Sequence, residues 1–275
     1  MAKALIIGVD SYPTRTYKTY GGLDALAFSN ALLTLRGKTF TRDNTRVLIN
    51  ERATSSAIME RLKWLKDVKS PDFYVLYFSG AGTIFNGRAT EGSVRAESIC
   101  ALAGQDFSFA DESTQVLLDY ILSPVEFQGN GVIILDCLFE YLGNYIGSDS
   151  AMLLSGDNML DSMRAKVLLP PGDILFRRNY DSRQSTLKLN IPVRKVVFYP
   201  GGTDPKLGAS GLSNMSSGSI FTEALINSWK ASPTATYLSL YKNLSQSLQD
   251  TGSAQFTPRM LAGSNFDLSK GFCTK

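Results

Sequence analysis

Two short stretches contain residues that could do chemistry, and each follows a run of apolar residues. "YFSGAG" places Ser79 ahead of two glycines that flank Ala81, and "IILDCLFE" places Asp136 next to Cys137. A thiol becomes a nucleophile when a base removes its proton, and a carboxylate can bind a cationic group. The chain has no histidine, so it lacks the commonest general base near neutral pH. Histidine-dependent serine or cysteine catalysis of the usual form is therefore excluded.

The elements that position these residues can be predicted from apolar patterning. Continuous apolar runs, typical of strands covered on both faces, predict strands at "ALIIGV" (4–9), "TRVLIN" (45–50), "FYVLYFSG" (73–80), "GVIILD" (131–136) and "RKVVFYPGG" (194–202). Helical spacing predicts helices over 23–35 and over 54–68, the second with Thr54 as N-cap. In the C-terminal third we expect a helix in 217–229 and another that begins at Pro233 with Ser232 as N-cap.

The alternation of strands and helices indicates an α/β fold with a mostly parallel sheet and helices on both faces. The carboxyl ends of neighbouring parallel strands line one crevice, where ligands bind. We therefore expect the Ser79 loop and Asp136 to meet at that edge of the sheet.

Composition limits the classes of protein to consider. The 275 residues suffice for one large α/β domain or two small ones. A net charge of +3 with scattered basic residues does not favour nucleic acid. The three cysteines, Cys100, Cys137 and Cys273, form neither a disulfide framework nor a zinc pattern. No apolar run reaches the ~20 residues of a membrane helix, and "MAKALIIGVD" is not a signal peptide. We expect a cytoplasmic protein with no cofactor, no metal, and no membrane or nucleic-acid partner.

Six segments, in order, resemble the caspase-like cysteine peptidases of the metacaspase and orthocaspase branch. They are "ALIIGVDSYP", "GGLDALAFSNAL", "DFYVLYFSGAG", "GVIILDCLFE", "SGSIFTEAL" and "AQFTPRMLAG". The resemblance implies a caspase-like fold with a sheet of about six strands, in one domain over 1–275. It divides that domain into a p20-like core (1–139), an irregular excursion (140–190) and a p10-like part (191–275). The basic residues of the excursion are Arg164, Lys166, Arg177, Arg178, Arg183 and Lys188.

By this resemblance both catalytic positions are empty. Ala81 stands where the family has its histidine, and Leu138 stands where it has its nucleophilic cysteine. Cys137 precedes that position; it is interpreted either as a fallback nucleophile or as a small buried residue. The N–H of Gly82 would be a remnant of the oxyanion hole.

The resemblance also implies an acidic substrate pocket formed by Asp24, Ser79 and Asp136. Such a pocket would bind an Arg or Lys side chain by charge-assisted hydrogen bonds. The alternative is that Asp24 flanks the start of its helix and that Asp136 binds loop backbone.

Three hypotheses about function follow. The chain is a pseudo-caspase that binds a peptide, an active homologue or itself; or it is a cysteine endopeptidase that uses Cys137; or it is a structural building block of a larger assembly. The empty dyad favours the first and the third.

Overall fold

A six-stranded sheet forms the centre of the computed structural model. The structure describes residues 1–13, 19–86, 98–108, 110–137, 166, 168, 191–200, 213–214, 218–250 and 258–274. The strands of the sheet are β1 (Ala2–Gly8), β2 (Thr45–Ile49), β3 (Phe73–Ser79), β7 (Asn130–Asp136), β8 (Lys195–Tyr199) and β11 (Arg259–Ala262).

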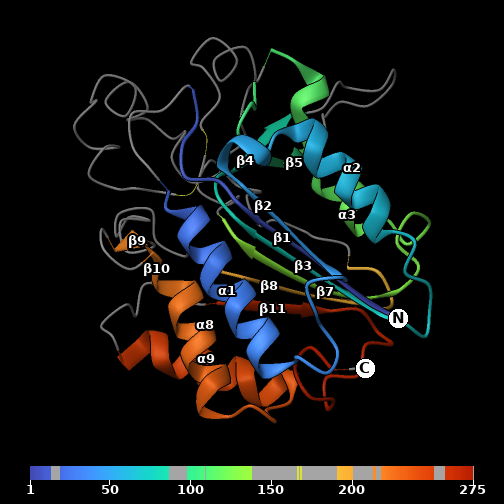
Figure 1. Ribbon diagram of the computed structural model, residues 1–275, viewed down its shortest axis with the longest axis vertical. Helices are drawn as coiled ribbons and strands as arrows, with labels where there is room; N and C mark the ends of the chain where they lie inside the picture. The colour runs from blue at the N-terminus through green and yellow to red at the C-terminus, as the bar shows by residue number, and fades with distance from the viewer. Residues whose placement is uncertain are drawn as a thin grey trace.

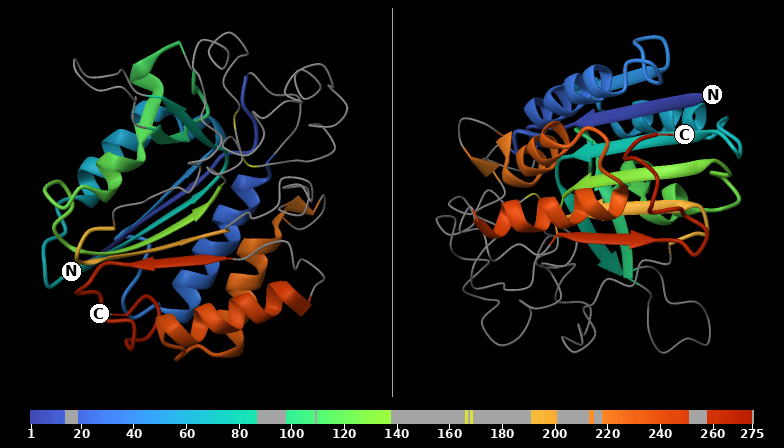
Figure 2. Two further views of the ribbon diagram at one scale, coloured as in Figure 1. Left: turned by 180° about the vertical axis from the view of Figure 1, so that it is seen from behind. Right: turned by 90° about the horizontal axis from the view of Figure 1, so that it is seen from below.

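The strands lie in the order β11-β8-β7-β3-β1-β2. All neighbours are parallel except β11, which runs antiparallel to β8 at one edge. Figure 2 shows these strands side by side, with β11 in red at the lower edge of the sheet in the right-hand view. The mostly parallel α/β sheet predicted from the sequence is confirmed, and its strands come from both the 1–139 and the 191–275 parts of the chain.

The helices cover both faces of this sheet, as predicted. They are α1 (Gly21–Leu35), α2 (Ser55–Leu65), α3 (Leu118–Leu122), α8 (Ile220–Ala231) and α9 (Tyr237–Asp250). Figure 1 shows α2 and α3 on one side of the sheet and α1, α8 and α9 on the other.

Strand alternation divides the core into two hydrophobic clusters. In β1, Leu5 and Ile7 face the cluster that contains α2 and α3, whereas Ala4 and Ile6 face the cluster that contains α1, α8 and α9. All four side chains are fully buried. Burial on both faces explains why the strands are continuous apolar runs.

The two predicted helix caps had different outcomes. The Thr54 side chain accepts a hydrogen bond from the N–H of Ala57, so the N-cap of α2 is confirmed. The predicted start of the last helix at Ser232 and Pro233 is wrong, because α9 begins at Tyr237. The N–H of Ser232 bonds back to the carbonyl of Ser228 at the end of α8, and the hydroxyl of Thr236 accepts from the N–H of Ser239 instead.

A smaller antiparallel sheet was not predicted. It consists of β4 (Gly82–Asn86), β5 (Ser98–Ala103) and β6 (Gln115–Leu117). Short elements complete the described chain: β9 (Ser213–Asn214), β10 (Gly218–Ser219) and the 3₁₀ turns η1 (Asn50–Arg52) and η2 (Glu112–Thr114). Strand β4 begins three residues after β3 ends, so it continues directly from the Ser79 loop.

In the part of the chain that the structure describes, no helix has the length and apolar character needed to cross a membrane.

Candidate functional site

The carboxyl ends of β3 and β7 bring Ser79 and Asp136 together. The two residues are direct partners in the parallel register of these strands. Asp24, in the first turn of α1, joins them: its carboxylate accepts a hydrogen bond from the Ser79 hydroxyl at 2.8 Å. The close approach of α1 depends on Gly21, because a Cβ at that position would lie 2.1 Å from the Ser79 carbonyl oxygen. The three residues of the predicted acidic pocket therefore lie in contact.

Lys166 of the chain itself fills this pocket. Its Nζ lies 2.6 Å from Asp24 Oδ2, 2.6 Å from Ser79 Oγ and 2.9 Å from Asp136 Oδ2. The lysine side chain is 0% exposed, and the two aspartates are 2% and 0% exposed. An ammonium group has three donors, and here each of them has an oxygen acceptor.

Further residues hold the carboxylates in place. Thr222 of α8 donates its hydroxyl to Asp136 Oδ2 at 2.6 Å and also lies 2.6 Å from the Tyr77 hydroxyl. The N–H of Ser219 donates to Asp24 Oδ1 at 2.7 Å. Two buried atoms in the described part of the site, Asp136 Oδ1 and Ser219 Oγ, have no hydrogen-bond partner. Asp24 thus lies in the first turn of α1 without capping it, and its backbone partner, Ser219, precedes α8. Asp136 Oδ2 is bound by the side chains of Lys166 and Thr222.

Burial and the neighbouring charges shift the pKa values of the groups in the pocket. Burial raises the pKa of Asp24 above its ordinary value, and the nearby Asp136 adds to the rise, although Lys166 opposes it. Burial alone would lower the pKa of Lys166, but Asp136 and Asp24 together raise it above its ordinary value. The two carboxylates therefore hold the lysine in its charged form.

The backbones of Lys166 and Leu168 pair with the first residue of β4. The N–H of Gly82 donates to the carbonyl of Lys166 at 3.1 Å, and the N–H of Leu168 donates to the carbonyl of Gly82 at 2.8 Å. The Thr83 hydroxyl donates to the carbonyl of Leu168 at 3.0 Å. This alternation is the hydrogen-bond pattern of a parallel bridge. The Gly82 N–H, predicted as an oxyanion-hole remnant, is thus bound to a carbonyl of the chain's own backbone.

Ala81 is fully buried in the core cluster on the α2 side of the sheet. Its N–H donates to the Tyr12 hydroxyl at 2.6 Å, and its carbonyl accepts from the N–H of Ala103. The Tyr12 hydroxyl in turn donates to the Ala103 carbonyl. The position that the resemblance assigns to histidine is therefore a packed, apolar one.

Cys137 also lies in the cluster on the α2 side and is 0% exposed. Asp136, its neighbour, points to the opposite side of the sheet, where Lys166 and Thr222 lie. The structure therefore matches the interpretation of Cys137 as a small buried residue. Leu138 lies outside the described residues.

Sequence reasoning missed the most important residue of the site. Lys166 was identified only as one basic residue of the 140–190 excursion, most of which lies outside the described residues. Thr222 and Ser219 were seen only as parts of a segment with a helical pattern. A signal for Lys166 existed: buried carboxylates are nearly always paired, so an acidic pocket in a compact chain requires a basic residue of its own or of a partner.

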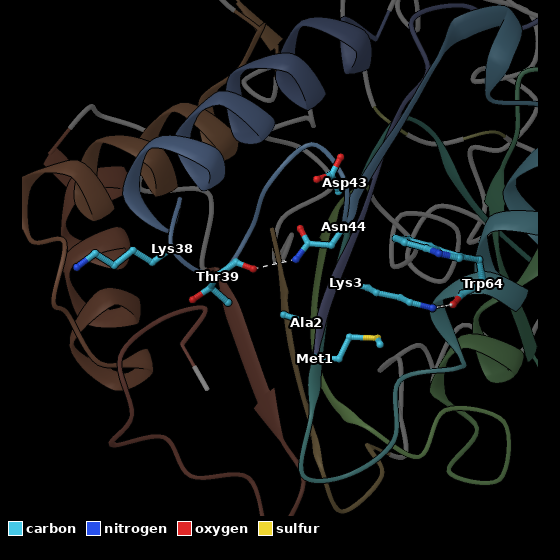
Figure 3. A pocket seen from close by; sticks show the side chains of 8 residues that line it. All are labelled: Met1, Ala2, Lys3, Lys38, Thr39, Asp43, Asn44 and Trp64. Carbon is cyan, nitrogen blue, oxygen red and sulfur yellow. Dashed lines mark hydrogen bonds between the residues drawn. The ribbon is translucent and has the colours of Figure 1, made fainter.

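A separate pocket of about 610 Å³ lies at the other end of the sheet, beside the amino ends of β1 and β2 (Figure 3). Its lining residues are Met1, Ala2, Lys3, Lys38, Thr39, Asp43, Asn44 and Trp64. Lys3 donates to the Trp64 carbonyl at 2.7 Å and lies 4.7 Å from the centre of the Trp64 ring, and Lys38 extends away from the tryptophan. The ammonium group of Lys3 is thus bound within the chain.

Among the described residues, no group of three or more His, Cys, Asp or Glu side chains could hold a metal ion. The oxygen atoms that could coordinate a metal at the Lys166 site, two carboxylates and a hydroxyl, instead bind the ammonium group of Lys166.

Comparison with solved structures identifies the fold. Protein GSU0716 from Geobacter sulfurreducens has a TM-score of 0.60 at 14% identity, with 95% of this chain and 93% of that chain covered. Caspase-1 from Spodoptera frugiperda has a TM-score of 0.53 at 13% identity, with coverage of 95% and 88%. The structure of pro-Sf-caspase-1 has a TM-score of 0.52 at 15% identity, with coverage of 95% and 86%. The chain has the caspase fold.

No protein-family model matches the sequence, and no curated protein matches it. The likeness is therefore one of fold, at identities of 13% to 15%. Within the caspase fold, this chain has an alanine and a leucine at the two positions that the resemblance assigns to catalysis, and a lysine of its own in the acidic pocket.

Proposed function

We propose that this caspase-fold protein has no peptidase activity and acts as a receptor for a basic side chain. In this proposal the pocket formed by Asp24, Ser79 and Asp136 binds a lysine of a partner. The chain's own Lys166 is the resident occupant, and a partner must displace it.

The observation that carries the proposal is the fit of Lys166 in the pocket. Three oxygen acceptors lie 2.6 to 2.9 Å from one ammonium nitrogen, so the pocket has the charge and geometry to bind a lysine. The backbone of the same segment pairs with Gly82, as an extended peptide would. The ligand class is therefore a peptide in extended conformation with lysine at the anchoring position.

Three observations support the absence of catalysis. There is no histidine in the chain, Ala81 is enclosed in the core, and the thiol of Cys137 is buried away from the pocket. A thiolate that attacks a peptide bond must reach the carbonyl carbon. Burial also disfavours the charged thiolate form of a cysteine.

The test is a binding titration with two fluorescent peptides. One peptide copies residues 163–170, and the other carries glutamine in place of the lysine. An occupied pocket weakens the apparent affinity by the fraction of molecules in which it is free. Lys166→Gln should therefore bind the lysine peptide at least roughly tenfold more tightly than wild type does. Asp136→Asn, added to Lys166→Gln, should abolish the preference for lysine over glutamine.

Controls separate binding from damage to the fold. Lys63→Gln, at an exposed position of α2, should leave peptide affinity and thermal stability unchanged. Lys166→Gln should lose about 3–5 kcal/mol of unfolding free energy, because two buried carboxylates lose their cation. If no variant that is folded by circular dichroism distinguishes the lysine peptide from the glutamine peptide, the proposal is wrong.

A further inference from the structure

Leu168 occupies a site of its own beside the lysine pocket. It follows Lys166 by two positions, and it is 3% exposed in the apolar cluster on the α2 side of the sheet. The same cluster contains Ala81 and Leu102, both fully buried, and Leu102 is the partner of Gly82 in the register of β4 and β5. The site of Leu168 is therefore an apolar one at the start of β4.

Hydrogen bonds hold the backbone of Leu168 at both of its polar groups. Its N–H donates to the carbonyl of Gly82 at 2.8 Å, and its carbonyl accepts from the Thr83 hydroxyl at 3.0 Å. Thr83 is fully buried. Because a buried polar group without a partner is costly, a residue at this site must supply both an N–H and a carbonyl. Proline, which has no N–H, does not meet this requirement.

The lysine pocket and the leucine site are coupled through Gly82. The N–H of Gly82 binds the carbonyl of Lys166, and the carbonyl of Gly82 binds the N–H of Leu168. Two residues of extended chain span at most about 7 Å. A peptide that takes the place of Lys166 on this backbone therefore brings its own residue, two positions later, to the site of Leu168.

We propose that this second residue determines specificity together with the lysine, so that the ligand is an extended peptide of the form Lys-x-Leu. The inference rests on the proposed function and narrows its ligand class. Removal of the Leu168 side chain from its site leaves apolar surface that a leucine of the partner would cover again. A polar side chain there would be buried among apolar residues without a partner for its hydrogen bonds.

The first test compares peptides that share one composition. The parent copies residues 163–170, in which two leucines follow one another at the positions of Leu168 and Leu169. Serine in place of the first leucine should weaken binding to Lys166→Gln at least roughly tenfold, as expected for the loss of a buried leucine. Serine in place of the second leucine is the matched control and should have little effect, because successive side chains of an extended chain point in opposite directions.

The second test keeps both leucine side chains and removes one backbone donor. N-methylation of the first leucine removes the N–H that would bind the Gly82 carbonyl, and it should weaken binding at least roughly fivefold. N-methylation of the second leucine should not, since alternate N–H groups of a strand face opposite sides. Equal effects of the two methylations would contradict binding of the first leucine at the start of β4.

The same titration includes the glutamine peptide, which separates failure of this inference from failure of the proposed function. If the lysine peptide binds more tightly than the glutamine peptide but the two serine peptides bind equally, the lysine pocket stands and the leucine site is wrong. If the lysine and glutamine peptides bind equally, the proposed function fails, and the Lys-x-Leu ligand fails with it. Preference for lysine together with weaker binding of only the first serine peptide is the result expected.

Discussion

At the residue scale, the site is a buried cluster of two carboxylates and one ammonium group. Asp24, Asp136 and Lys166 are at most 2% exposed, and the lysine is bound by both carboxylates. Buried ion pairs of this kind contribute little net stability, but removal of one partner is costly. The cluster therefore fixes the position of Lys166 relative to α1 and the central sheet.

The raised pKa of Asp24 predicts a dependence of stability on pH. Because its folded pKa lies above 3.8, Asp24 contributes most to stability below 3.8, and this contribution is lost as the pH rises through the folded pKa. Wild type should thus gain unfolding free energy relative to Asp24→Asn as the pH falls from 7 to 4.

The measurement is chemical denaturation of both proteins at each pH, with Asp43→Asn, at an exposed site, as the control. A difference between wild type and Asp24→Asn that stays constant with pH, or that shrinks toward pH 4, would contradict a raised pKa at Asp24.

At the element scale, the strands and the helix cap that depend on local sequence pattern were predicted. The runs at β1, β3 and β7 are apolar because both faces of the central strands are covered, and the Ser79 and Asp136 ends meet because these strands are parallel neighbours. The hydroxyl cap at Thr54 is local and was predicted. The cap at Thr236 was not predicted. Helix α9 begins where Thr236 forms a β-bridge with Gly271, a residue far along the sequence.

The position of Lys166 could not be predicted, because it too depends on contacts with residues far away in the sequence. Its three bonds join residues 30, 87 and 142 positions away. Neither helical nor strand periodicity carries such a signal. The short strands β4, β5 and β6 were not predicted.

Leu168, two residues after Lys166, is 3% exposed and packs in the cluster on the α2 side. Leu168→Ala should lower the unfolding free energy by about 2–5 kcal/mol, the usual cost for a buried leucine. It should also strengthen binding of the lysine peptide, because the internal occupant is held less tightly.

Leu168→Met, which nearly conserves volume, should cost less than ~1.5 kcal/mol and leave peptide affinity unchanged. Denaturant unfolding and peptide anisotropy measure the two effects. Loss of stability without any gain in affinity would show that Leu168 does not anchor the occupant of the pocket.

At the scale of the whole molecule, the chain has the caspase fold, and its site lies at the carboxyl edge of the central sheet. The sheet still brings two strand ends and α1 to one point, and the chain uses that point to bind a lysine.

The molecule as a whole is expected to have no peptidase activity. Fluorogenic peptides ending in Arg, Lys or Asp, with and without calcium, should show no turnover above that of Cys137→Ala. Turnover that disappears in Cys137→Ala would mean that the buried thiol reaches a substrate, and it would contradict the proposed function.

The most direct test of the occupied pocket is the chemical reactivity of Lys166, measured by acetylation of the native protein and mass spectrometry. Lys166 should be modified at least roughly tenfold more slowly than the exposed Lys242, because modification requires local opening. The lysine peptide should raise the rate at Lys166, and the glutamine peptide should not. Modification of Lys166 as fast as Lys242, or a rate that neither peptide changes, would contradict an acidic pocket filled by an exchangeable lysine.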